Sequence, residues 1–368
     1  MDVRSIIAPV VTDMEGLREF IDALIDHAPK IERNVARLKV VPSDREVLAD
    51  LFRSVHNIKG DAALCKIELA VAIAHPIETV LARLRDGELK FTEFLAEAIL
   101  LSIDRLELAA EGLASGKQLD SLRLLPLVQG LEKIALAASK EVDAGASEMI
   151  QAVTGFRPSA ASSISARGKV SSLPGDSTTP VAEDLRFFRM LANQLEARSS
   201  LFKGRTTRIL RLAQETNQIA GQTIDPVQLE AAVCMHDIGM MFLPESVWLK
   251  VDRITPEEKS KLATHPEIAG GILSRMEGWS AASEMVLQHH EMPDGGGYPR
   301  GSKGEQICAG AKVLAIVDAF EAVMLKHIQR GRNRSVLRAI AEVNACDKQF
   351  APEWIEPFNR VIRRSVEA

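Results

Sequence analysis

The stretch HHEMPDGGGYP at residues 289–299 decides how the rest of the chain is interpreted. It joins a histidine doublet to a glycine-rich turn that holds the only tyrosine of the chain, Tyr298. The flanking sequence is rich in the same chemistry. Between positions 236 and 318 lie four of the eight histidines and two well-placed aspartates: His236, Asp237, His265, His289, His290 and Asp318. This density of imidazole and carboxylate groups calls for a chemical explanation.

Neutral imidazoles combined with carboxylates form a mixed nitrogen and oxygen ligand set, which suits manganese, iron or zinc better than calcium or magnesium. The sequence therefore predicts a metal site. The alternative is that each histidine is core or surface filler, and the doublets His236-Asp237 and His289-His290 argue against it. The spacing differs from that of a His-Glu-x-x-His zinc helix, so the ligands must come from several elements.

Several separated motifs in this region resemble those of HD-GYP domains, the HD-superfamily phosphodiesterases that hydrolyse cyclic di-GMP. They occur in order between residues 204 and 330: His236-Asp237-Ile238-Gly239, Thr264-His265-Pro266-Glu267, His289-His290-Glu291, Asp294-Gly295-Gly296-Gly297-Tyr298-Pro299, and Asp318 in an apolar segment. The resemblance implies two divalent metal ions, iron or manganese, bridged by Asp237 and sharing a hydroxide that attacks the phosphodiester. It implies metal ligands at His236, Asp237, His265, His289, His290 and Asp318, with His236 and Asp237 as the catalytic pair. It also implies a substrate-binding wall at Gly297, Tyr298 and Pro299.

The chain departs from the family pattern at two positions that carry charge. Arg205 stands where the family has a histidine ahead of the His-Asp helix, and arginine cannot ligate a metal at any ordinary pH. Met240 stands where the family has a phosphate-contacting lysine, so stabilisation of a charged transition state is weakened. We expect Arg205 to replace part of that charge in substrate binding. Arg330, in the basic run after Asp318, is expected to contact the nucleotide, with a solvated basic loop as the alternative.

The N-terminal part of the chain has a helical pattern. From Met14 to about Ala138, apolar residues recur at spacings of three and four, as in amphipathic helices. Breaks at Pro42-Ser43, Asp86-Gly87 and Ser115-Gly116 separate segments of bundle length, with a serine cap at the first break. Short connections favour antiparallel neighbours. The predicted fold class is all-α, with a helical bundle at residues 1–140.

His56 is the candidate reactive group of this bundle. On a helix, Lys59 and Gly60 lie on the same face three and four residues further on. The lysine can offset the charge of a phosphoryl group, and the glycine leaves the face open to a second protein. A solvated helix face with an incidental histidine is the alternative. The pattern, followed by a helix with Glu78 and then Asp86-Gly87, resembles histidine phosphotransfer (Hpt) domains. This resemblance implies that His56 accepts phosphoryl and that its partner is the receiver domain of a response regulator or a histidine kinase.

Composition predicts the remaining organisation. Residues 141–182 are rich in serine, proline and glycine and are expected to form a flexible linker. The resemblance to HD-GYP domains implies that residues 183–368 form a multi-helix domain of that family. The net charge of −5 argues against a DNA partner. Neither a signal peptide nor an uncharged apolar span is found, so we expect a cytoplasmic protein without membrane insertion. The sequence leaves open whether the chain forms a homodimer.

The combined expectation is a two-component signalling protein. Its Hpt domain accepts phosphoryl on His56, and its HD-GYP domain hydrolyses cyclic di-GMP to pGpG or GMP. The alternative is an HD-GYP domain inactivated through Arg205 and Met240, which binds nucleotide or protein while His56 carries the signal. Hydrolysis of some other nucleotide is a third reading.

Overall fold

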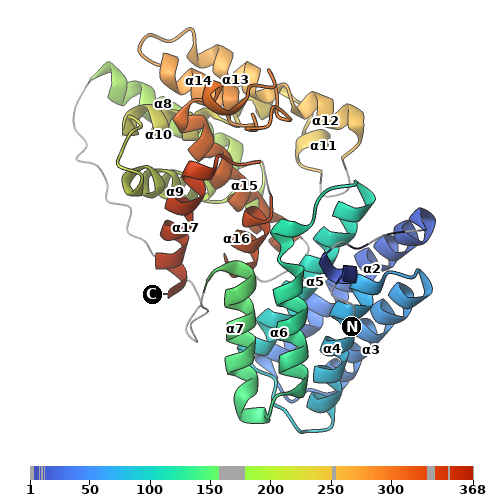
Figure 1. Ribbon diagram of the computed structural model, residues 1–368. Coiled ribbons are helices and arrows are strands. Elements are labelled where there is room, and N and C mark those ends of the chain that lie inside the picture. Colours follow the sequence, from blue (N-terminus) through green and yellow to red (C-terminus); the bar gives the residue numbers. More distant parts are fainter. Residues whose placement is uncertain are drawn as a thin grey trace. The chain divides into compact units, whose positions relative to one another are not determined.

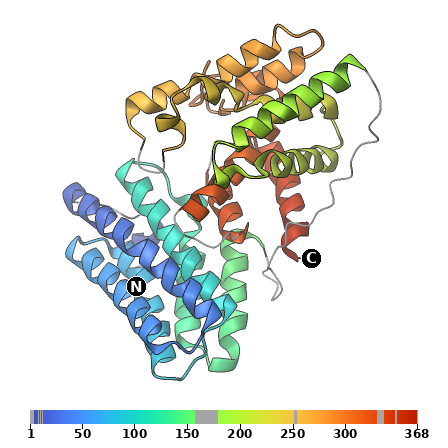
Figure 2. The same ribbon diagram turned by 180° about the vertical axis from the view of Figure 1, so that it is seen from behind.

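The computed structural model describes residues 4–7, 9, 11, 13–156, 179–250, 254–329, 336–346 and 349–367. Every regular element in these ranges is a helix, which confirms the all-α fold class. The chain divides into two compact units (Figure 1, Figure 2). The first contains helices α1 to α7 and α16, and the second contains α8 to α15 and α17. None of the helices in the described ranges combines the length and the apolar character that a membrane crossing requires.

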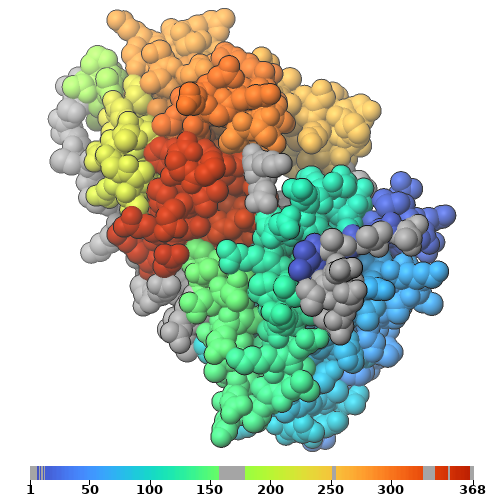
Figure 3. Space-filling view, viewed as in Figure 1, coloured from blue at the N-terminus to red at the C-terminus, as the bar shows by residue number. Residues whose placement is uncertain are grey.

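The first unit is a helical bundle. Its helices are α1 (Arg4–Ile7), α2 (Met14–Val40), α3 (Arg45–Leu64), α4 (Glu68–Arg85), α5 (Glu93–Ala114), α6 (Leu124–Leu136), α7 (Val142–Thr154) and α16 (Val336–Asn344), with 3-10 turns at Asp120–Leu122 and Ser139–Glu141. Helix α3 packs between α2 and α4, and α6 packs against α4 and α7. The inward faces are leucine, isoleucine, valine and alanine, which form the core. In the space-filling view, the atoms of α3 to α7 form a closely packed surface (Figure 3).

Helices α3 and α4 form the pair that carries His56. Helix α3 begins at Arg45 because the carboxylate of Asp44 accepts the backbone N–H groups of Glu46 and Val47. The sequence prediction of a serine cap was therefore wrong by one residue. Helix α4 continues through the buried Pro76, which has no N–H to donate to the preceding turn.

Two segments correct the expected domain boundaries. Helix α7 lies inside the range 141–182 that composition assigned to the linker, and its apolar residues Val142, Met149 and Ile150 are buried. Residues 157–178 of that linker lie outside the described residues. Helix α16 was expected in the C-terminal domain but packs against α5 and α7 in the first unit.

The second unit is a separate cluster of short helices. They are α8 (Pro180–Glu196), α9 (Arg205–Ile219), α10 (Pro226–Met235), α11 (Glu245–Trp248), α12 (Pro256–Leu262), α13 (His265–Leu273), α14 (Ser280–Gln288), α15 (Ala309–Gln329) and α17 (Pro352–Glu367), with 3-10 turns η3 (Ser200–Phe202), η4 (Ile238–Phe242) and η5 (Gly304–Gln306). Helix α10 packs against α8, α9 and α14, and α15 packs against α9 and α14. These contacts bring the ends of α9, α10, α13 and α14 to one place beside α15.

Candidate metal centre and phosphotransfer site

The candidate metal ligands come from four different helices. His236 and Asp237 follow α10, His265 begins α13, His289 and His290 follow α14, and Asp318 lies within α15. Glycine allows these ends to approach closely. A Cβ atom at Gly239 would lie 2.1 Å from the carbonyl oxygen of His265, so a larger residue would push α13 away from the segment that carries Asp237.

The glycine-rich loop packs against the histidine doublet. A Cβ atom at Gly297 would lie 2.4 Å from the carbonyl oxygen of His290, and the backbone N–H of Tyr298 donates to that same oxygen at 3.2 Å. The Tyr298 ring lies 4.8 Å from the His290 ring, centroid to centroid, and Pro299 follows through a cis peptide bond. Burial raises the pKa of Tyr298, so its hydroxyl keeps its proton at neutral pH. The loop therefore places the ring of a neutral tyrosine against the ring of His290.

The ligand atoms form two clusters of three. One consists of His265, His289 and His290, and the other of His236, Asp237 and Asp318, with the atoms of each within 4.8 Å of one another. A single residue links them, since Asp237 Oδ2 lies 3.1 Å from His236 Nε2 while Asp237 Oδ1 lies 3.5 Å from His265 Nε2. Asp237 therefore lies between the two clusters, as a bridging ligand must.

Backbone carbonyls fix which nitrogen of each histidine faces the cluster. The Nδ1 atoms of His236, His265 and His289 lie 2.6–2.8 Å from the carbonyl oxygen three residues earlier. A carbonyl only accepts hydrogen bonds, so each Nδ1 carries a proton and each Nε2 presents a lone pair in the neutral ring. The Nε2 atoms of His265 and His289 nevertheless lie 3.4 Å apart. Two lone pairs at that distance repel each other unless a cation lies between them.

The electrostatics of the all-histidine cluster favour neutral rings. Burial lowers the pKa of His265, and it holds that of His289 well below its usual value. Burial, with the nearby His265, lowers the pKa of His290 to about 4. Neutral imidazole is the form that binds a metal ion. This donor set therefore fits a divalent cation such as iron, manganese or zinc.

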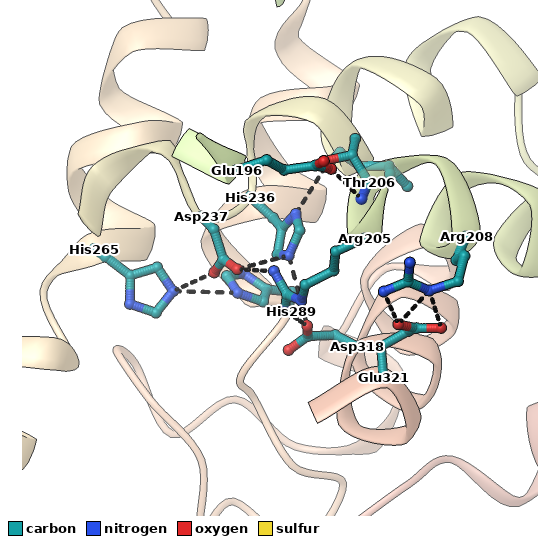
Figure 4. A network of polar contacts seen from close by, with 11 residues as sticks. Glu196, Arg205, Thr206, Arg208, His236, Asp237, His265, His289, Asp318 and Glu321 are labelled. Carbon is teal, nitrogen blue, oxygen red and sulfur yellow. Dashed lines mark hydrogen bonds and ion pairs between the residues drawn. The ribbon is translucent and has the colours of Figure 1, made fainter. Parts of the chain in front are cut away.

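The second cluster contains a cation of its own. The guanidinium of Arg205, at the start of α9, donates from Nη1 to Asp237 Oδ2 at 2.5 Å and from Nη2 to Asp318 Oδ1 (Figure 4). The Arg205 side chain is 13% exposed. Burial opposes ionisation of both carboxyls, but His236 and Arg205 outweigh it and hold the pKa values of Asp237 and Asp318 well below the usual range. Burial likewise opposes protonation of His236, but Asp237 and Asp318 raise its pKa to about 10.

A second arginine on α9 was missed by the sequence reasoning. Arg208 donates from Nε to both oxygens of the buried Glu321, at 3.1 and 2.9 Å. Arg205 and Arg208 are three residues apart on α9, and Asp318 and Glu321 are three apart on α15, so the pairs stack along two packed helices. That matched spacing of arginine and acid was the signal available in the sequence.

Of the two remaining positions that bear on substrate binding, the structure describes Met240 but not Arg330. Met240 lies in η4, half-buried, and its backbone N–H donates to the carbonyl oxygen of Asp237 at 2.9 Å. The prediction for Arg330 lies outside the described residues. Glu291 stabilises the glycine-rich loop, because its carboxylate accepts the backbone N–H groups of Arg300 and Ser302 at 2.7 and 2.9 Å. This role of Glu291 was also missed.

The first unit holds a second candidate site around His56. The His56 side chain is 58% exposed on α3, and its Nδ1 donates to Glu78 Oε1 on α4 at 2.6 Å. Lys59 donates to the other oxygen of Glu78. Burial opposes ionisation of Glu78, but Lys59 and His56 outweigh it and lower its pKa. With Nδ1 bound to a carboxylate, the His56 Nε2 is left with its lone pair towards solvent.

The surroundings of His56 leave this nitrogen accessible. The Phe52 ring stacks on the imidazole at a centroid distance of 6.1 Å, one turn earlier on α3. One turn later, a Cβ atom at Gly60 would meet nothing within 4 Å, so the surface beside the ring is open. The geometry suits attack by the lone pair of an oriented imidazole on the phosphorus atom of an incoming phosphoryl group.

Comparison with known proteins gives one family match in each half of the chain. Residues 15–109 match the Hpt domain family, and residues 189–352 match the HD domain family. A cyclic di-GMP phosphodiesterase of Thermotoga maritima is 32% identical over 134 residues, which cover 36% of this chain and 36% of that protein. The cyclic di-GMP phosphodiesterase response regulator RpfG of Xanthomonas campestris is 31% identical over 139 residues, with the same coverage of 36% and 36%. A 3'3'-cGAMP-specific phosphodiesterase of Vibrio cholerae is 28% identical over 152 residues, which cover 41% of this chain and 35% of that protein.

The matched part thus spans 36% of the length of the first two relatives. The two family matches do not overlap, and each contains the corresponding cluster of side chains. The chain combines an Hpt domain at residues 15–109 with an HD domain at residues 189–352.

Proposed function

We propose that this chain is a phosphorelay-linked, metal-dependent phosphodiesterase that hydrolyses cyclic di-GMP. The observation that carries the proposal is the 3.4 Å approach of the His265 and His289 Nε2 atoms, whose repulsion a bound cation would relieve. The names of the relatives support the substrate class. The six predicted ligands, in two clusters, support at least one ion at His265, His289 and His290.

A bound divalent ion supplies a Lewis acid for a phosphate oxygen and makes a nearby water more acidic. The residues of the chain account for the rest of the mechanism. His265, His289 and His290 would hold the ion, the first two through Nε2, because backbone carbonyls accept their Nδ1 protons and orient the rings. Asp237 Oδ1 has no hydrogen-bond partner, so this oxygen would be available to ligate the ion. The Tyr298 hydroxyl and the Arg205 guanidinium can donate to phosphate oxygens. Gly297 and Pro299 shape the loop beside them.

His56 accepts a phosphoryl group from the aspartyl phosphate of a receiver domain, or returns it. In the forward direction, the P–O bond of the acyl phosphate breaks and a P–N bond forms to His56 Nε2. Glu78 keeps the Nδ1 proton in place during this step. Lys59 lies on the same carboxylate and can offset the negative charge of the transferred group.

The phosphoryl state of His56 sets the output of the HD domain. Support comes from the fusion of both domains in one chain and from α16, which belongs to the matched HD segment but packs in the first unit. A change in kcat after phosphorylation, lost in His56→Ala, would support this coupling. Equal kcat values in the two states would remove it.

The test of the enzymatic proposal is anaerobic incubation with cyclic di-GMP after loading with ferrous iron or manganese. Products are resolved by chromatography, with Asp237→Ala as the control. We expect pGpG or GMP from the wild type and neither from the variant. A panel with 3'3'-cGAMP distinguishes the substrate from that of the Vibrio cholerae relative.

A binding module without catalysis is the second candidate. The ion pairs of Arg205 with both Asp237 and Asp318 favour it, because they neutralise two carboxylates that would otherwise bind metal. The absence of hydrolysis with either metal, together with measurable binding of cyclic di-GMP, would support the module and contradict the enzyme.

A further inference from the structure

The two clusters of candidate ligands differ in how their charge is balanced. The cluster of His265, His289 and His290 consists of neutral imidazoles whose lone pairs face each other. Among the described contacts of this cluster, no lysine or arginine side chain takes part. The cluster of His236, Asp237 and Asp318 has two carboxylates, and a guanidinium is bound to both. Only the first cluster therefore needs a cation from solution.

Arg205 binds the carboxylates as a fork. One terminal nitrogen donates to Asp237 and the other to Asp318, so the single side chain joins residues of α10 and α15. Guanidinium is planar and always charged, and its two terminal nitrogens match two acceptors at once. It holds the two oxygens that would otherwise be free to ligate an ion in this cluster, Asp237 Oδ2 and Asp318 Oδ1 (Figure 4).

The position of Arg205 is fixed by more than these two contacts. One turn further along α9, Arg208 donates hydrogen bonds to both carboxylate oxygens of Glu321. Glu321 lies three residues after Asp318 on α15. At the other end, the Glu196 carboxylate accepts the backbone N–H groups of Gly204 and Thr206, at 2.6 Å each. The helix start that carries Arg205 is thus held on both sides of the residue. If Arg205 left the site, Asp237 and Asp318 would lose their guanidinium partner and keep only His236, whose Nε2 lies 3.1 Å from Asp237 Oδ2 and 3.6 Å from Asp318 Oδ1.

We propose that Arg205 is a built-in second cation, and that this HD domain binds one divalent ion, at His265, His289 and His290, instead of two. Asp237 then bridges the ion and the guanidinium, with Oδ1 towards His265 and Oδ2 towards Arg205. The guanidinium supplies hydrogen bonds and one positive charge to a phosphate, but it cannot acidify a water as a metal ion does. This inference rests on the proposed metal-dependent function of the same site, and it is tested without turnover.

The test is the number of ions per chain. The full chain is loaded anaerobically with manganese, desalted, and analysed for metal and protein content. We expect about one ion for the wild type, about two for Arg205→His, which frees both carboxylates and adds an imidazole, and about one for Arg211→Ala. Arg211 is the matched control, because it is a half-exposed arginine on the same helix that pairs with Glu215. His265→Ala should lose the single ion of the wild type.

Electron paramagnetic resonance of the manganese-loaded wild type gives a second readout that needs no variant. A lone ion gives the six-line spectrum of isolated manganese, whereas two ions roughly 3.5–4 Å apart couple and give a different spectrum. About two ions, or a coupled spectrum, in the wild type would overturn the proposal. A wild type without metal, or an Arg205→His variant that still holds one ion, would also overturn it. Failure of cyclic di-GMP hydrolysis with one bound ion would count against the proposed function and leave the ion count standing.

Discussion

The Nε2 atoms of His265 and His289 lie 3.4 Å apart, and neither ring can donate a hydrogen bond to the other in its neutral form. Each ring uses its Nδ1 proton on the carbonyl oxygen of its own helix end, Leu262 or Val286. The two histidines are therefore oriented by the backbone to present lone pairs to a common point. Because the lone pairs repel each other without a cation, metal binding is expected to raise the stability of the fold as well as to support activity.

Metal should stabilise the chain through His289. At an ion concentration about 100 times the dissociation constant, a site present only in the folded state adds about 2.7 kcal/mol to the free energy of unfolding. We expect manganese to raise the Tm of the wild type and to leave that of His289→Ala unchanged. Thermal unfolding with and without manganese measures this. His75→Ala, at an exposed histidine of α4, should respond like the wild type. An equal rise in His289→Ala would show that the stabilising ion binds elsewhere.

The residues of the two candidate clusters could be identified from the sequence because they lie in short motifs whose spacing is local. The place of Arg205 could not, because its two partners lie 32 and 113 residues away along the chain. The sequence analysis expected Arg205 to replace a lost charge near the substrate. Its pairing with Asp237 and Asp318 depends on how α9 packs against α10 and α15, and the matched three-residue spacing on α9 and α15 does not include Asp237.

Glu78 should control the rate of phosphotransfer to His56. Glu78→Gln keeps the shape of the side chain but replaces a charged hydrogen bond to Nδ1 by a neutral one. We expect phosphoryl transfer from a phosphorylated receiver domain to be about tenfold slower, equivalent to about 1.4 kcal/mol. Radiolabel transfer measures the rate. Glu88→Gln, which changes an exposed partner of Arg83, is the control and should transfer at the wild-type rate. An unchanged rate in Glu78→Gln would remove the orienting role.

The same residue predicts a pH dependence of stability. Lys59 and His56 outweigh burial and lower the pKa of Glu78 below 4.5 in the folded state. A carboxyl with a depressed folded pKa contributes stability that is present above pH 4.5 and lost as the pH falls through the folded value. We expect the difference in free energy of unfolding between wild type and Glu78→Gln to shrink from pH 6 to pH 3. Urea titrations followed by circular dichroism measure it. A constant difference over this range would contradict the prediction.

The sequence predicted the helical bundle of the first unit, but it did not predict which residues belong to that unit. Apolar spacing identified the bundle, but the average composition of residues 141–182 concealed helix α7, whose buried face contains Met149 and Ile150. Helix α16 could not be placed, because Arg338 and its partner Asp104 are 234 residues apart in the chain. The contacts that place α16 in the first unit join residues far apart in the chain, so no local periodicity reveals them.

Arg338 should hold α16 in the first unit. Its guanidinium donates to Asp104 and, at 3.0 Å, to Glu32, and all three side chains are buried. Removing one member of a buried ion pair leaves charge without compensation, which costs about 3–5 kcal/mol. We expect Arg338→Met to lower the free energy of unfolding by that amount and to speed proteolysis at α16. The control is Arg360→Met, at an exposed arginine of α17. A loss below about 1 kcal/mol would show that the apolar face of α16 suffices.

Restoring a cation at Met240 should raise hydrolysis, if loss of charge is what limits the HD domain. Met240 follows Asp237 by three residues in η4 and is half-buried, so a lysine there can reach a phosphate bound beside Asp237. One added donor to transition-state charge is worth up to about 100-fold in kcat, and we expect about tenfold because Arg205 already supplies part of the charge. Steady-state assays with cyclic di-GMP separate kcat from KM for Met240→Lys. The neighbouring Met241→Lys is the matched control, since it adds the same charge one residue away. A rise in kcat in Met240→Lys but not in Met241→Lys would show that missing positive charge limits the rate of hydrolysis. No rise in kcat in either variant would show that the rate is limited by the single-ion site that Arg205 forms.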